Sequence, residues 1–123
     1  MAVEDNIREI PADLARAGEA RHFIFWRAAV AGLGGGGLSE LATAAAAVLT
    51  DVFLSAGGGV LKISSEHSSE RLRIAIEHPE LSPGSRRMHN LSDLLERFLD
   101  GYEISATRTV LIKDLTRREP QGG

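Results

Sequence analysis

Residues 41–64, LATAAAAVLTDVFLSAGGGVLKIS, decide the fold of this chain. The first part places apolar residues at i, i+3, i+4 and i+7, the periodicity of one face of a helix. From residue 60 onward, apolar and polar residues alternate, as in a half-buried strand. The glycines at residues 57–59 separate the two parts and are expected to end the helix. A helix followed by a strand shows that the chain combines both kinds of element.

The same two periodicities extend to both sides of this stretch. We expect a first long helix over residues 12–31, with Pro11 in its first turn and Gly32 at its end. The glycines at 34–37 are interpreted as a flexible linker, and Ser39 as the cap of the second helix. The other expected elements are strands at 7–10, 60–64, 72–76, 102–105 and 109–113, and a third helix that starts at Asn90 or Ser92 and ends at Gly101.

This order of elements predicts an α+β two-layer sandwich, with the helices on one face of a mixed four- or five-stranded sheet. We expect a single domain over residues 1–116 and a disordered tail over 117–123. The apolar stripes of the second and third helices predict four core residues, which are Val48, Val52, Leu94 and Phe98.

Composition excludes several classes of function. The 123 residues include 14 basic and 17 acidic side chains, a net charge of −3, so a basic surface for nucleic acid or anionic lipid is not expected. The chain has no cysteine, which excludes disulfides and thiolate metal sites. Residues 1–6 lack the apolar run of a signal peptide, and no stretch approaches the ~20 apolar residues of a membrane span. We therefore expect a cytoplasmic protein with no nucleic-acid or membrane partner.

The run from Leu41 to Asp51, followed by the strand from Val60, resembles the N-box helix and next strand of a known family. This family comprises the anti-sigma factors and switch serine/threonine kinases of the RsbT and RsbW (SpoIIAB) type, in the GHKL ATPase superfamily. Residues 98–105 and 109–113 resemble the end of the same family's domain. The resemblance covers about residues 7–116 and implies a Bergerat-like, histidine kinase-like ATPase fold.

The resemblance also implies that the catalytic machinery is degenerate. The family's second helix carries a Glu that activates the nucleophile and, four residues later, an Asn that holds Mg²⁺. Ala47 and Asp51 occupy these positions here, and alanine cannot accept a proton. Asp51 could still bind Mg²⁺ through its carboxylate, or it could simply be a polar residue near a helix end.

The family's two glycine-rich boxes are replaced as well. The adenine-reading Asp-x-Gly-x-Gly corresponds to residues 78–82, HPELS, and the second glycine box corresponds to residues 87–91, RMHNL. A close glycine backbone approach to the nucleotide is therefore lost. Thr50 and Thr109 remain, with Asp51, as residual candidates for the nucleotide pocket. The resemblance thus implies no bound cofactor, and Mg-ATP only if kinase activity persists.

The first helix carries the most unusual local sequence, residues 23–26, FIFW. At about 100° per residue, four large apolar side chains in a row surround the helix, and one packing face cannot bury them all. We interpret Arg21, His22, Phe23 and Trp26 as a candidate partner-binding surface, because aromatic and arginine side chains are frequent interface anchors. The alternative is burial of these residues under the N-terminal strand or a loop.

The function expected from these observations is that of a regulatory protein-interaction module, a degenerate RsbT-like anti-sigma or switch protein in which ATP binding is lost. The resemblance implies a partner such as a sigma factor, a STAS-domain antagonist or another signalling protein, and a homodimer is compatible with it. One alternative is an active serine/threonine kinase that phosphorylates a STAS-domain antagonist. A second is a phosphotransfer or histidine-kinase accessory module, which His22 beside Arg21 would suit.

Overall fold

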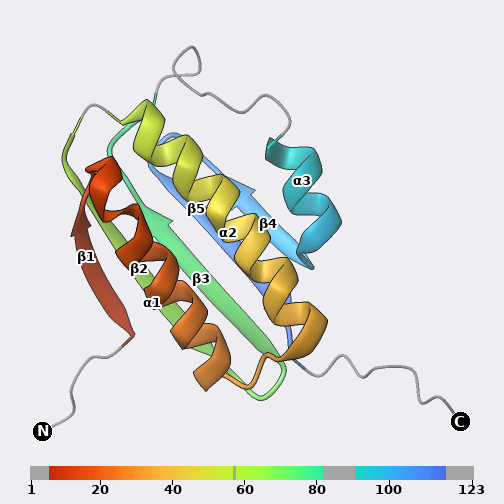
Figure 1. Ribbon diagram of the computed structural model, residues 1–123. Helices are drawn as coiled ribbons and strands as arrows, with labels where there is room; N and C mark the ends of the chain where they lie inside the picture. The colour runs from red at the N-terminus through yellow and green to blue at the C-terminus, as the bar shows by residue number, and fades with distance from the viewer. Residues whose placement is uncertain (1–5, 57, 82–90, 116–123) are drawn as a thin grey trace, which may run out of the picture.

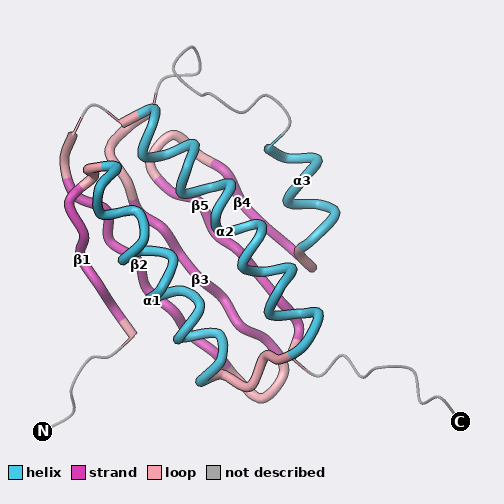
Figure 2. The backbone as a smooth tube through the Cα atoms, viewed as in Figure 1, coloured by secondary structure: helices cyan, strands magenta, loops and turns pink. Residues whose placement is uncertain are grey.

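A computed structural model describes residues 6–56, 58–81 and 91–115 of the chain. Helices lie in front of a twisted sheet in the view of Figure 1, and the backbone trace of Figure 2 shows the same two layers. The elements in chain order are β1 (Ile7–Pro11), a 3₁₀ turn (Leu14–Arg16), α1 (Ala17–Val30), α2 (Gly35–Ser55), β2 (Val60–His67), β3 (Arg71–Glu77), α3 (Leu91–Phe98), β4 (Gly101–Ile104) and β5 (Arg108–Asp114).

The sheet has five strands in the order β1-β2-β3-β5-β4. All four strand pairs are antiparallel, so the expectation of a mixed sheet was wrong. Short turns join β2 to β3 and β4 to β5, and such hairpins force antiparallel pairing. α3 connects the two hairpins and packs against α2 and β4. The expected α+β architecture, with helices on one face of the sheet, is confirmed (Figure 1).

The core lies between the sheet and the helices α1 and α2. Alternate residues of the central strands face the helices and are buried, among them Ile63, Ile74 and Leu111. Val48 and Val52 of α2 are fully buried, as predicted. Leu94 and Phe98 were expected beside them, but they are only partly buried at the edge of the core. The residues of the α3 segment that enter the core are Leu91, Leu95 and Leu99.

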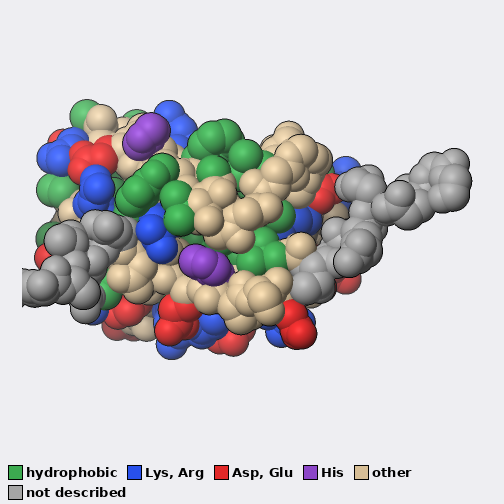
Figure 3. All heavy atoms as spheres, turned by 90° about the horizontal axis from the view of Figure 1, so that it is seen from below, with side chains coloured by type: hydrophobic (Ala, Val, Ile, Leu, Met, Phe, Trp, Pro, Cys, Tyr) green, Lys and Arg blue, Asp and Glu red, His purple; other side chains and the backbone are tan. Residues whose placement is uncertain are grey.

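The opposite face of the sheet is charged. Strand register aligns Glu9, Lys62, Glu77 and Arg108 in one row across β1, β2, β3 and β5. All four residues are exposed, and their charges alternate in sign along the row. In Figure 3, charged side chains lie close together along the lower edge of the molecule, and hydrophobic side chains lie above them. Alternating charges of this kind are typical of a solvated sheet face.

One buried charge links the two layers. Lys113 of β5 points towards the helices and is only 4% exposed. Its Nζ lies 2.7 Å from Oε1 of Glu40 in α2 and donates to the carbonyl oxygen of Phe98, at 2.8 Å. This pair joins the start of α2, the end of α3 and the last strand. Sequence reasoning did not find it, because its two members are far apart along the chain.

Helix boundaries differ from expectation at the starts of α1 and α2. Pro11 ends β1 instead of starting a helix, and α1 begins only at Ala17, after a 3₁₀ turn. The glycines at 35–37 form the first turn of α2, so they are not a linker, and Ser39 lies inside the helix. Glycine pays at most about 1 kcal/mol in a helix, which the apolar stripe from Leu38 onward can offset. The expected helix end at Gly32 is confirmed by its φ of 102°.

α2 is long and apolar enough, by length and composition alone, to cross a membrane. This differs from the expectation that no stretch of the chain approaches that limit. The core helix of a folded domain passes the same test, and α2 has eight buried residues. The helix therefore gives only weak evidence for a membrane span. The expected second glycine box, apart from Leu91, and the tail over 117–123 lie outside the described residues.

Candidate functional site

Two regions of the structure contain the candidate residues predicted from the sequence. One surrounds the polar residues that the family resemblance assigns to a nucleotide pocket. The other is α1, which carries the partner-binding candidates.

The polar candidates are mostly inside the protein. Asp51 of α2 and Thr109 of β5 are completely buried. His78, which follows β3, is also buried, and its Nε2 lies 3.3 Å from Oγ1 of Thr109. Thr50, by contrast, is exposed, so the structure does not place it with the others. In this region His78 and Thr109 thus form a buried polar contact.

The segment after β3 packs onto the protein's own core. Nδ1 of His78 lies 3.0 Å from the carbonyl oxygen of Pro79. The N–H groups of His78 and Leu81 donate to the carbonyl oxygens of Thr107 and Ala106, at 3.0 and 2.9 Å. Leu81 is buried in the core cluster. The segment that corresponds to the family's adenine-binding box is thus joined by two backbone hydrogen bonds to the turn between β4 and β5.

Asp51 is not part of an evident metal site. Within the residues described here, no group of three or more His, Asp or Glu side chains is placed so that it could hold a metal ion. Hard cations such as Mg²⁺ take several oxygen ligands. Among the described residues, Asp51 therefore belongs to no group of three or more such side chains that could hold the ion.

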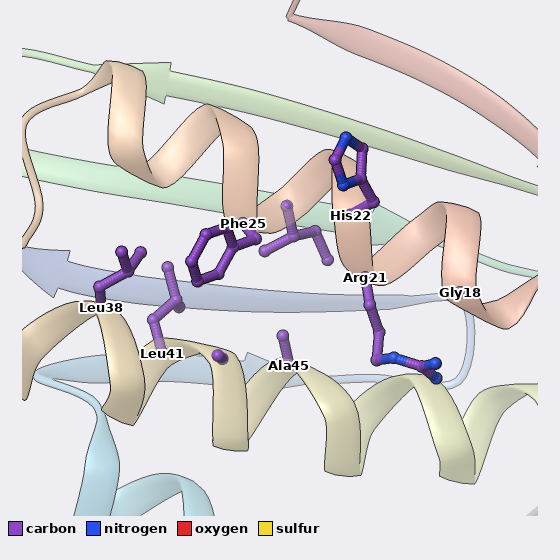
Figure 4. Close-up of a pocket in the computed structure, with 9 residues that line it drawn as sticks. Gly18, Arg21, His22, Phe25, Leu38, Leu41 and Ala45 are labelled. Atoms are coloured by element: carbon purple, nitrogen blue, oxygen red, sulfur yellow. The ribbon is translucent and has the colours of Figure 1, made fainter.

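A groove of about 310 Å³ lies between α1 and α2 on the side away from the sheet. Figure 4 shows the ring of Phe25 leaning across it towards Leu38 and Leu41. At its other end the Arg21 side chain extends from α1 towards α2. The complete lining is Gly18, Arg21, His22, Ile24, Phe25, Leu38, Leu41, Ala42 and Ala45. The groove is thus apolar along its length, with a guanidinium at one end.

The charge of Arg21 is not neutralised by any residue that the structure describes: no hydrogen bond or ion pair joins it to them. Neighbouring arginines differ in this respect. Arg16 pairs with Glu19 at 2.6 Å, and Arg27 donates to Oγ of Ser65 at 2.9 Å. His22 is exposed and points away from α2 (Figure 4). The groove therefore offers one uncompensated cation.

The aromatic run divides between the two sides of α1. Phe23 is only 2% exposed and belongs to the core, so its assignment to a partner-binding surface was wrong. Trp26 is 40% exposed, as the sequence predicted for at least one member of the run. Phe25, at 48%, is the most exposed aromatic of the run and was missed. Residues four apart lie on the same face of a helix, so the spacing between Arg21 and Phe25 could have identified Phe25 as part of this surface.

The exposure of Trp26 can be measured directly, because it is the only tryptophan of the chain. We expect acrylamide to quench its emission in the isolated protein, since the indole is partly open to solvent and Arg27 covers it from one side, 5.2 Å from the ring centroid. The matched control is the same measurement on unfolded protein, which sets the limit of full access. Emission that acrylamide leaves unquenched in a proven monomer would contradict this placement.

A scan of the chain against protein-family models gives no match, and a search of curated proteins gives none either. The family resemblance therefore depends on the residue patterns described above. Function must be argued from the groove and the buried polar contact.

Proposed function

We propose that this chain is a regulatory protein-interaction module, a Bergerat-like domain of the RsbT type that binds a partner and does not use ATP. The observation that carries the proposal is the groove between α1 and α2, which is lined by exposed Phe25 and has at its end Arg21, a cation with no partner among the described residues. Trp26 adds a second exposed aromatic side chain on α1, outside the groove lining. Exposed aromatic and arginine side chains around an apolar depression are typical of protein interfaces. The partner class follows the resemblance: a cytoplasmic sigma factor, STAS-domain antagonist or other signalling protein.

The region of the nucleotide-site resemblance supports the second half of the proposal. The general-base position is Ala47, which has no proton-accepting group. His78 engages Thr109, and Leu81 is part of the core, so these side chains occupy space in the protein interior. Phosphoryl transfer depends on positioning of the phosphates, and residues 78–82 and 87–91, which correspond to the family's two glycine boxes, contain no glycine.

The experiment that tests this function is a calorimetric titration of the purified chain with Mg-ATP and with Mg-ADP. We expect no binding tighter than about 1 mM, a standard free energy of only ~4 kcal/mol. Micromolar binding that requires Mg²⁺ would overturn the proposal and favour the serine/threonine kinase. Stable phosphorylation of His22 by a histidine kinase would instead favour the phosphotransfer module.

A further prediction concerns Ala47→Glu, which restores a carboxylate at the general-base position. We expect this variant to remain inactive, because a base without the phosphate-wrapping glycines leaves the phosphates unpositioned. The measurement is transfer of radiolabelled phosphate from ATP to a STAS-domain protein, with a competent family kinase as positive control. Label on the substrate with the variant alone would show that the nucleotide site is intact.

A further inference from the structure

We propose that the outer face of the sheet, the face opposite the helices, binds the same face of a second copy of this chain. The two copies form a two-fold dimer whose axis runs parallel to the strands, between β2 and β3. The inference is carried by the charges of this face, which complement themselves under that rotation. It does not depend on the proposed function, because the groove lies on the helix side and stays open in such a dimer.

No helix that the structure describes covers the outer face. α1, α2 and α3 all lie on the other side of the sheet (Figure 1). Side chains of a strand alternate between the two faces, so the residues between the core positions point outwards. Val60 is one of them, and it gives the face an apolar side chain that is 54% exposed. Another protein surface can therefore approach this side of the molecule.

One row of the outer face carries exposed charges of alternating sign. In the order β1, β2, β3, β5 the row consists of Glu9, Lys62, Glu77 and Arg108. None of the four forms an ion pair or hydrogen bond with a residue that the structure describes. Elsewhere on the same face, by contrast, Arg73 lies 3.6 Å from Glu66. The row thus has four charges that are available to a partner.

This row complements itself in one orientation. Rotation about an axis between β2 and β3 places β2 of one copy opposite β3 of the other, and β1 opposite β5. Lys62 then lies opposite Glu77 of the second copy, and Glu9 lies opposite Arg108 of the second copy. Every contact occurs twice in a two-fold dimer, so the row forms four pairs of opposite charge. An axis along the row would instead set equal charges against each other.

The next two rows fit the same axis. The first has no charge on these four strands and consists of Ile7, Ser64, Ala75 and Val110. Its small side chains, Ser64 and Ala75, lie opposite each other across the axis and allow a close approach. In the second row, Glu66 on β2 lies opposite Arg73 of the second copy. Three successive rows therefore satisfy one symmetry.

The size of this face predicts a weak dimer. Four overlapping strands spaced about 4.8 Å apart, with about six residues of 3.3 Å each, give a flat area of roughly 400 Å² per copy. This is at the low end of specific interfaces, so the dimer forms only at high protein concentration. Sheets stacked face to face cross at about 30°, which makes the contacts nearest the axis the strongest.

Sedimentation equilibrium of the purified chain from about 10 µM to 1 mM tests the dimer. We expect a monomer–dimer equilibrium that added salt weakens. Lys62→Glu and Glu77→Lys should each weaken association by at least ~10-fold, because each variant sets like charges against each other twice. An equimolar mixture of the two variants should associate again, since all these pairs in the mixed dimer have opposite charges. Mixing leaves the neighbours within each chain unchanged, so the recovery reports contact between chains.

Arg97→Glu is the matched control, because Arg97 is an exposed cation of α3, on the helix side. It should leave association unchanged. Equal weakening by Arg97→Glu and Lys62→Glu would reduce the effect to general electrostatics and overturn the inference. A chain that stays monomeric up to about 1 mM would overturn it too, as would a mixture that associates no better than either variant alone.

Lys62 and Glu77 are exposed, so the variants are expected to fold, and thermal unfolding verifies this. If a single variant unfolds, the double variant Lys62→Glu, Glu77→Lys replaces it. The exchange keeps opposite charges across the axis, so the double variant should dimerise like the unmodified chain, and a monomeric double variant would overturn the inference. These measurements involve neither nucleotide nor the groove, so their failure leaves the proposed function standing.

Discussion

Phe23→Ala should destabilise the fold by about 3–5 kcal/mol, enough to unfold a domain of ordinary stability. The ring is 2% exposed, packs in the core cluster and lies 5.1 Å below the guanidinium of Arg8. Removing it leaves a cavity between α1 and the sheet edge. Urea unfolding followed by circular dichroism measures the loss as a shift of the midpoint at constant slope.

Trp26→Ala is the control for this prediction. Its indole lies three residues further along α1, with ring centroids 6.3 Å apart, but it is 40% exposed. We expect this substitution to cost less than about 1.5 kcal/mol, since much of the ring stays in water in the folded state. If Trp26→Ala destabilised the fold more than Phe23→Ala, the orientation of α1 described here would be wrong.

Glu40→Ala should destabilise the protein by about 3 kcal/mol, although Glu40 itself is partly exposed. The loss arises on the other partner, because Lys113 is buried and, among the described residues, keeps only the carbonyl oxygen of Phe98 as an acceptor. A buried ammonium without its carboxylate is costly. Thermal unfolding at low and moderate salt measures the effect, and salt should reduce it, since the side chain of Glu40 is 43% exposed and its attraction to Lys113 is partly screened.

The double variant Glu40→Ala, Lys113→Met provides the control. Methionine fills a similar volume without a charge, so we expect it to recover most of the stability lost in Glu40→Ala. A double variant as unstable as the single one would show that Glu40 acts through the start of α2 instead of through Lys113.

The sequence predicted the order of elements because their periodicities are local. The stripe of α2 and the alternation in β2 and β3 are visible within a few turns or residues, and the structure confirms all three. The glycines at 35–37 were misread as a linker, because glycine lacks helix propensity of its own. The helix nevertheless begins at these glycines, because the residues after them pack in the core and stabilise the whole helix. This tertiary packing is not visible in the local sequence.

The candidate surface was only partly predictable. Arg21, His22 and Trp26 are exposed on α1, as the sequence indicated, but a run of four apolar residues does not show which member faces the sheet. Phe23 is core and Phe25 is exposed, because the orientation of α1 follows from its packing on β2 and α2. The groove itself needs two helices side by side and had no sequence signal.

The central claim is that the chain acts through protein contact on α1 and α2 and not through a bound nucleotide. A residue-resolved NMR titration of one ¹⁵N-labelled sample tests this claim most directly. Mg-ATP up to about 1 mM should leave the amide signals of Asp51, His78 and Thr109 unshifted. A protein partner of the proposed class, a sigma factor or a STAS-domain protein, should then shift signals along Gly18–Phe25 and the facing turns of α2. Saturable shifts at Asp51, His78 and Thr109 with Mg-ATP, together with unshifted groove signals after addition of the protein partner, would contradict the account.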